Sequence, residues 1–331
     1  MFLVAMSLSN GEEDSENIAK EMVAIDDYAN GWRHLVLPIS FETEAVMDAV
    51  SAASAFHIAS KHNAMVTTAQ YLYTKAIQGL TRRQDFTKAG KDITSQNILA
   101  LLVLLVSVMI TGCSDFPVLY KILECALDSI GGEGALGTSD LAQFIRRQVR
   151  KCVQDCERLC VGRVLTASRF RVYGSVMVSE QMGIETIQKR ALQTFECLEH
   201  CSIQHPEYAQ ATSNITNQIQ QAFNIYLRRA LGELDRSNSN LLVEHFIQTA
   251  EAYPKSCSSA EHALIWASFI VAAESSLPEH QQFFRDRLTA FNLGNGFSNI
   301  LKGLEVLESV WRTTPHTRWT AIISQGHTFV M

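Results

Sequence analysis

The sequence predicts an all-α fold. Apolar residues recur at the three- and four-residue spacing of amphipathic helices along nearly all of the 331 residues. Runs that alternate β-branched and polar residues, the pattern of a strand, are nearly absent, and the best candidate is RVYGSVMV at 171–178. No repeat of 20–50 residues is evident, so a solenoid is not indicated. We therefore expect one large helical domain of antiparallel helix pairs.

The first half of the chain begins with a polar entry helix at 16–30. We accordingly divide the chain into a polar lead-in, 1–30, and a single domain, 31–331. The segment WRHLVLP at 32–38 is expected to form a turn. Helical periodicity then predicts helices over 42–61, 63–80, 95–112 and 117–130. The most apolar stretch, ILALLVLLVSVMI at 98–110, should therefore lie at the centre of the core.

The second half follows a glycine-rich breaker, GGEGALGT at 131–138. Helices are expected over 139–164, 180–201, 209–236 and 241–253, with turns at 205–206 and in the Ser/Asn run 237–240. Helical periodicity also covers 260–288 and 303–319. Ser258 and Ser276 each precede a glutamate by three residues, as in a capping box, and Pro278 falls in the first turn of the second helix.

Composition and charge exclude several classes of protein. Hydrophobic residues make up 47% of the chain and charged residues 19%, which is typical of a folded globular protein. The net charge of −6 argues against direct DNA binding, because a protein that neutralises phosphates carries a basic excess. The thirteen-residue run 98–110 is shorter than the roughly twenty residues of a membrane span. The opening MFLVAM is too short for a signal peptide, so we expect an intracellular protein.

The eight cysteines do not predict a metal site. No two of them are separated by two residues, so the CxxC knuckle of zinc-cluster and zinc-ribbon sites is absent. Cys152, Cys156 and Cys160 recur every four residues on an apolar helical stripe, where reduced cysteine packs as a small hydrophobe. Cys197 and Cys201 flank a glutamate and a histidine, which leaves metal binding there as a weaker alternative to a structural role. We expect no metal and no cofactor.

Known catalytic motifs are also missing: the chain has no GxSxG elbow, no HExxH and no phosphate-binding loop. The remaining candidates for catalysis are acid–base groups inside apolar helices. Glu274, Glu124 and His57 are the candidate catalytic residues, because a buried titratable group must be paired, neutralised or functional. The alternative for each is a structural role as a paired or capping residue.

Aromatic residues near the C-terminus could wall a hydrophobic pocket for a ligand. The candidate ligand-binding residues are Trp266, Phe269, His262, Trp311 and Trp319, although large aromatic residues also fill ordinary cores. The two most apolar helices, 95–112 and 260–276, are expected to pack together and to wall the largest cavity.

Six segments, taken in order, are similar to a known family. They are WRHLVLP at 32–38, AVSAASAFHIA at 49–59, YLYTKAIQGL at 71–80, and the segments 97–112, 260–288 and 303–319. Their order and spacing resemble the fungal-specific transcription factor domain, the helical regulatory region of zinc-cluster transcription factors. The resemblance implies a module for dimerisation, effector response and contact with the transcription machinery. The zinc cluster and its basic linker have no counterpart, and 111–173 follows the family pattern loosely.

Two functions follow from this resemblance. The first is a stand-alone regulatory module, nuclear and non-enzymatic, that acts through a protein partner or a homodimer and could also bind a small apolar effector. The second is a repurposed, cytoplasmic, cofactor-free enzyme of secondary metabolism. It would be a cyclase, isomerase or dehydratase that acts on a hydrophobic metabolite by general acid–base catalysis. In neither case do we expect direct binding to DNA or to a membrane.

Overall fold

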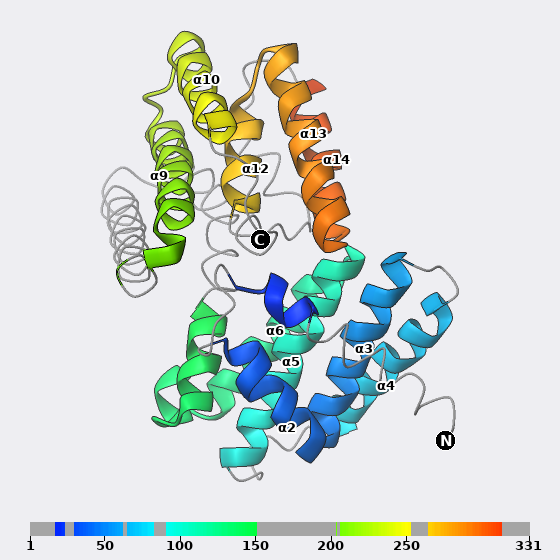
Figure 1. Ribbon diagram of the computed structural model, residues 1–331. Coiled ribbons are helices and arrows are strands. Elements are labelled where there is room, and N and C mark those ends of the chain that lie inside the picture. Colours follow the sequence, from blue (N-terminus) through cyan, green and yellow to red (C-terminus); the bar gives the residue numbers. More distant parts are fainter. Residues whose placement is uncertain are drawn as a thin grey trace, which may run out of the picture. The chain divides into compact units, whose positions relative to one another are not determined.

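The computed structural model describes residues 17–23, 30–61, 65–82, 91–150, 203, 206–252 and 264–312. Every regular element in these ranges is a helix, which confirms the all-α prediction (Figure 1). The chain divides into two compact units. One comprises Met1–Gln154 together with Asn295–Asn299, and the other comprises Asp155–Gly294 with Ile300–Met331. The single domain over 31–331, with a lead-in at 1–30, stays a prediction.

The first unit is a bundle in which one apolar helix is covered by the others. Its elements are η1 (Trp32–Val36), α2 (Leu37–Glu42), α3 (Glu44–Lys61), α4 (Val66–Arg82), α5 (Lys91–Thr111), α6 (Phe116–Ser129), η3 (Glu133–Leu136) and a helix described over 140–150. The α3 helix packs against α2, α4 and α5, and α5 packs against α6 (Figure 1). Figure 1 shows α3 and α4 side by side as a hairpin next to α5.

The α5 helix forms the core of this unit. No residue from 98 to 110 is more than 4% exposed. Among the described residues, Thr94–Thr111 is long and apolar enough to cross a membrane, but 89% of it is buried inside the protein. Because lipid-facing helices would not be covered in this way, burial among the neighbouring helices accounts for its composition. The expected central position of 98–110 is confirmed within the first unit.

The segment 32–38 is helical, so the turn expected there is wrong. Trp32–Val36 forms a single π-helical turn that runs directly into α2. Pro38 lies at the start of α2, where a missing backbone N–H removes no helical hydrogen bond. Proline here continues the helical path instead of breaking it.

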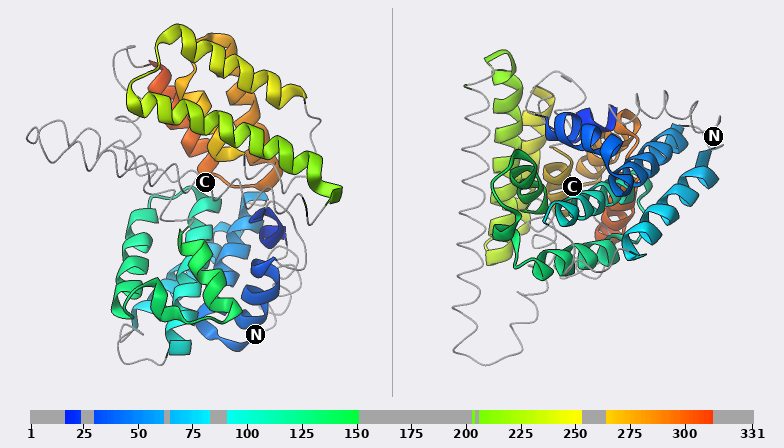
Figure 2. Two further views of the ribbon diagram at one scale, coloured as in Figure 1. Left: turned by 90° about the vertical axis from the view of Figure 1, so that its left-hand side faces the viewer. Right: turned by 90° about the horizontal axis from the view of Figure 1, so that it is seen from below.

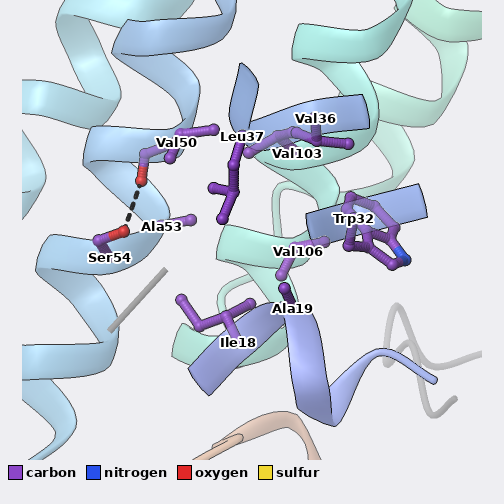
Figure 3. Close-up of a pocket in the computed structure, with 10 residues that line it drawn as sticks. All are labelled: Ile18, Ala19, Trp32, Val36, Leu37, Val50, Ala53, Ser54, Val103 and Val106. Carbon is purple, nitrogen blue, oxygen red and sulfur yellow. Dashed lines mark hydrogen bonds between the residues drawn. The ribbon is translucent and has the colours of Figure 1, made fainter. Parts of the chain in front are cut away.

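A short helical segment before η1 packs onto the same core. Ile18, Ala19 and Met22 are each at most 7% exposed, and the Asn30 side-chain amide donates to the Ala19 carbonyl at 2.9 Å. Figure 3 shows Ile18 and Ala19 with residues of α3 and α5 around a cavity of about 30 Å³. A cavity of that size holds one or two water molecules at most, so it is a packing defect and not a ligand site.

The second unit consists of α9 (Ala209–Leu231), α10 (Arg236–Ala252), α12 (Ile265–Glu274), α13 (Pro278–Asn295) and α14 (Asn299–Arg312), preceded by η5 (Pro206–Tyr208). The α9 and α10 helices form an antiparallel pair, and both pack against α12 (Figure 2). Every residue of α12 is buried. Phe246 of α10 and Phe284 of α13 are fully buried, with ring centroids 5.9 Å apart, and they extend this core.

The Ser/Asn run 237–240, expected to be a turn, lies inside α10. The α9 helix ends at Gly232, which adopts a left-handed φ of 75° and terminates the helix earlier than the sequence indicated. Asp235 then caps the start of α10, because its carboxylate accepts from the Asn238 backbone N–H at 2.8 Å. Serine and asparagine are common both at helix starts and in loops, and in this protein residues 237–240 form the first part of α10.

The five residues Asn295–Asn299 belong to the first unit, although the helices on either side of them belong to the second. Phe297 is fully buried, and the Ser298 backbone N–H donates to the carbonyl of Ile110 at 2.9 Å. Gly296 has a φ of 74°, and a Cβ placed on it would lie 2.9 Å from Ser60 Oγ. A residue without a side chain is therefore favoured at position 296.

Candidate functional site

A cavity of about 360 Å³ lies between α4, α5 and α6 in the first unit. This volume is at the lower end of the roughly 300–1,000 Å³ typical of small-molecule pockets. The lining comes from three helices: Ile77, Leu80 and Thr81 of α4, Leu101 and Leu104 of α5, and Leu119, Lys121, Ile122, Cys125 and Ala126 of α6.

Helical spacing explains why the walls of this cavity are apolar. Leu101 and Leu104 lie one turn apart on the same face of α5, and Leu119 and Ala126 lie two turns apart on the facing side of α6. Leu80 of α4 adds the third wall, and all five residues are at most 4% exposed. A ligand in contact with them would therefore bury apolar surface.

The polar side of the cavity comes from Lys121 and Cys125, which are four residues apart on α6 and both exposed. Lys121 Nζ lies 3.2 Å from Glu124 Oε2. This hydrogen bond from Lys121 to Glu124 raises the pKa of Lys121, so the side chain is an ammonium ion at neutral pH.

The expectation that Glu124 is buried is wrong. Its side chain is 41% exposed and forms an ion pair with Lys121 on the outer side of α6. The surrounding sequence is apolar, but the helix turns Glu124 away from the core while Leu123 and Leu127 face inward.

Glu274 is buried, as expected, and is held by three donors in the second unit. Its side chain is 3% exposed and forms a two-pronged ion pair with Arg229, with Arg229 Nε 2.9 Å from Oε2. The Ser239 hydroxyl donates to Oε1 at 2.6 Å, and Arg229 also donates to the Leu234 carbonyl at 3.3 Å. The network joins the end of α9, the start of α10 and the end of α12, a structural arrangement.

His57, the third candidate catalytic residue, lies on α3 in the first unit and is 3% exposed. Its Nε2 is 3.3 Å from the carbonyl oxygen of Asn295. Because Asn295 begins the segment that returns to this unit, the histidine holds that segment in place.

Three of the aromatic candidates lie in the second unit. Trp266 and Phe269 are on α12, at 8% and 2% exposure, and Trp266 meets the ring of Tyr226 edge-on with centroids 6.4 Å apart. The indole N–H of Trp311 donates to the Ala272 carbonyl at 2.8 Å, and Arg285 lies over its ring. These contacts hold the helices of the unit together, and a role of the three residues in ligand binding stays a prediction.

Two further candidates, His262 and Trp319, lie outside the described residues. The α5 helix lines the 360 Å³ cavity, but neither Trp266 nor Glu274 does. Within the described ranges, α5 packs against α3 and α6, whereas α12 packs against α9 and α10 of its own unit. Each of the two most apolar helices thus has apolar partners within its own unit.

A half-buried polar cluster joins α4 to the start of α6. The Tyr73 hydroxyl donates to Asp115 Oδ2 at 3.1 Å. Burial raises the pKa of Tyr73 strongly, and the nearby Cys113 and Asp115 raise it further, so Tyr73 stays protonated and acts as a donor. This cluster orients the α5–α6 connection, and none of its three residues lines the 360 Å³ cavity.

Metal-binding groups do not gather in the part of the chain that the structure describes. No three His, Cys, Asp or Glu side chains there could hold one ion. Cys113 and Cys125 are free thiols, and the other six cysteines lie outside the described residues. The structural role expected for those six stays a prediction.

The helical fold defines the class of protein: the described part of the chain is an all-α module, and an apolar cavity lies among the helices of its first unit. Comparison with family models then identifies it: the model of the fungal specific transcription factor domain matches residues 15–147 and 159–331. The chain belongs to this family, and the resemblance seen in the sequence is confirmed. No curated protein and no solved structure matches the chain. Membership of the family supports a regulatory role.

Proposed function

We propose that the chain is a stand-alone regulatory module that acts in the nucleus through a protein partner and responds to a small apolar effector bound between α4, α5 and α6. The observation that carries this proposal is the 360 Å³ cavity, whose walls are leucine and isoleucine from three helices. Occupancy of such a cavity stabilises the arrangement of those helices by the binding free energy, and this gives the effector a means of changing the protein.

The enzyme alternative is not proposed, because the candidate catalytic groups have structural partners. Glu274 is held by Arg229 and Ser239, and Glu124 by Lys121. The 360 Å³ cavity is lined by neither glutamate.

A bulky side chain placed in the lining of the cavity should weaken binding of a neutral apolar probe. We expect Cys125→Trp to weaken binding of N-phenyl-1-naphthylamine at least about tenfold, since the indole occupies space that the probe needs. The measurement is a fluorescence titration of the purified protein. Val118→Trp is the matched control, because Val118 is an exposed residue of the same helix, at 62%, and does not line the cavity. Equal affinities in the two variants, or no binding by the wild type, would disprove the effector site.

We also expect that the chain alone does not bind duplex DNA at physiological salt. The net charge of −6 opposes contact with phosphates, and a partner must then supply the contact with DNA. An electrophoretic mobility shift titration with random-sequence duplexes tests this. Sub-micromolar binding that weakens steeply with salt would contradict it.

A further inference from the structure

The cavity between α4, α5 and α6 has one charged group in its described lining, and that group is a cation. Lys121 is an ammonium ion on a helix whose other lining residues are Leu119, Ile122, Cys125 and Ala126. An apolar body can therefore lie against the leucines while one end of the molecule reaches Lys121.

Lys121 also has donors left for a ligand. An ammonium carries three N–H groups, and Glu124 accepts one hydrogen bond at 3.2 Å. Thr81, the other oxygen-bearing lining residue, already donates to the Ile77 carbonyl at 3.0 Å, so its hydroxyl hydrogen is in use. Lys121 is thus the group in this lining best able to bind an acceptor.

We propose that the effector is an amphipathic carboxylate whose hydrocarbon part lies between Leu101, Leu104 and Leu119 and whose carboxylate binds Lys121. This inference rests on the proposed function, since it names the chemical class of the effector for the same cavity. A cationic headgroup would be repelled at this position, and a neutral one would gain less from the ammonium.

Glu124 acts in this scheme as an internal competitor. Its carboxylate already occupies one side of Lys121, and it is 41% exposed, so it can move away when an incoming carboxylate takes its place. Glu124 is therefore a positioning residue for Lys121, which is a different role from the acid–base function that the sequence suggested.

A matched pair of ligands tests the headgroup separately from the cavity. Decanoate and decan-1-ol have the same chain length and differ in charge at one end. Each is titrated against protein loaded with N-phenyl-1-naphthylamine, and the inhibition constant is obtained from the loss of probe fluorescence. In Lys121→Met we expect the constant for decanoate to rise about fourfold, because a partly screened charge contact is lost. The constant for decan-1-ol should not change.

Substitution of Glu124, the partner of Lys121, should change the affinity for decanoate in the opposite direction. In Glu124→Gln the competitor is removed, so decanoate should bind about twofold to threefold more tightly, with decan-1-ol again unchanged. Lys302→Met is the control, since Lys302 pairs with Glu305 at the same i,i+3 spacing, at 2.9 Å, on α14 and outside the cavity lining. It should alter neither constant.

The outcomes separate the two proposals. If the probe binds and Cys125→Trp blocks it, but Lys121→Met leaves decanoate unaffected, the carboxylate assignment is wrong and the apolar effector site stands. If the wild type does not bind the probe at all, the effector site fails and the carboxylate assignment fails with it. Lys121 is 71% exposed, so its replacement should not perturb folding, and a circular dichroism spectrum verifies this.

Discussion

Replacing Glu274 by glutamine should lower the free energy of unfolding of the second unit by about 3 kcal/mol. The amide keeps the shape of the side chain but leaves the guanidinium of Arg229 without a counter-charge, and Arg229 is only 22% exposed. The amide can still accept from Ser239. The loss therefore comes mainly from the uncompensated charge, and it should be among the largest effects of a nearly isosteric change in this protein.

Urea unfolding followed by circular dichroism measures this loss, and hydrogen exchange locates it. Glu308→Gln is the control, because Glu308 pairs with Arg285 at 2.6 Å at a site where both side chains are about 30% exposed. We expect about 0.5–1 kcal/mol there, as for a solvent-screened pair. Equal losses in the two variants would show that burial does not set the strength of the Arg229–Glu274 pair.

A compensated variant separates lost charge from lost packing. In Arg229→Met/Ser239→Ala/Glu274→Leu the polar members are replaced together by apolar groups, so no buried charge or donor is left alone. We expect most of the stability lost in Glu274→Gln to return. Stability that stays as low as in Glu274→Gln would mean that the network is needed for the geometry of α9, α10 and α12 beyond its charge balance.

The helices of the described chain were largely predictable because their apolar spacing is local information. Helices α3, α4, α5 and α6 match the expected ranges to within about four residues. Two of the differences, at 32–38 and 237–240, concern residues that serve helix starts as well as loops. Pro38 and the residues after Asp235 are interpreted correctly only once the preceding turn of the chain is known.

The candidate site was predictable only in part. Glu274 was identified as a buried acid, but its partner Arg229 lies 45 residues away, a separation that helical periodicity cannot bridge. The pairing of Lys121 with Glu124 was visible in the sequence as an i,i+3 spacing, and it could have shown that Glu124 faces solvent. The cavity itself depends on how three helices pack, which no local pattern records.

The last expected result concerns Phe297, in the segment Asn295–Asn299 that returns to the first unit. Phe297→Ala should lower the free energy of unfolding of that unit by about 3–5 kcal/mol, the range for truncating a buried phenylalanine. The side chain is fully buried, and two hydrogen bonds flank it: Ser298 to the Ile110 carbonyl, and His57 to the Asn295 carbonyl. A local pattern at 295–299 would not indicate such an effect on α3, whose His57 lies 238 residues before Asn295, or on α5.

Hydrogen exchange distinguishes a loss of stability confined to the first unit from a general destabilisation of the protein. Protection should fall in α3 and α5, which contact the segment through His57 and Ile110, while α9, α10 and α12 keep theirs. Leu293→Ala is the control, because Leu293 lies four residues earlier and is 80% exposed, so its truncation should change stability by less than about 0.5 kcal/mol. Loss of protection in the second unit alone would show that Phe297 does not stabilise the first. The expected pattern instead makes the buried His57 part of a tether, which is a structural reason for an imidazole among the alanines of α3.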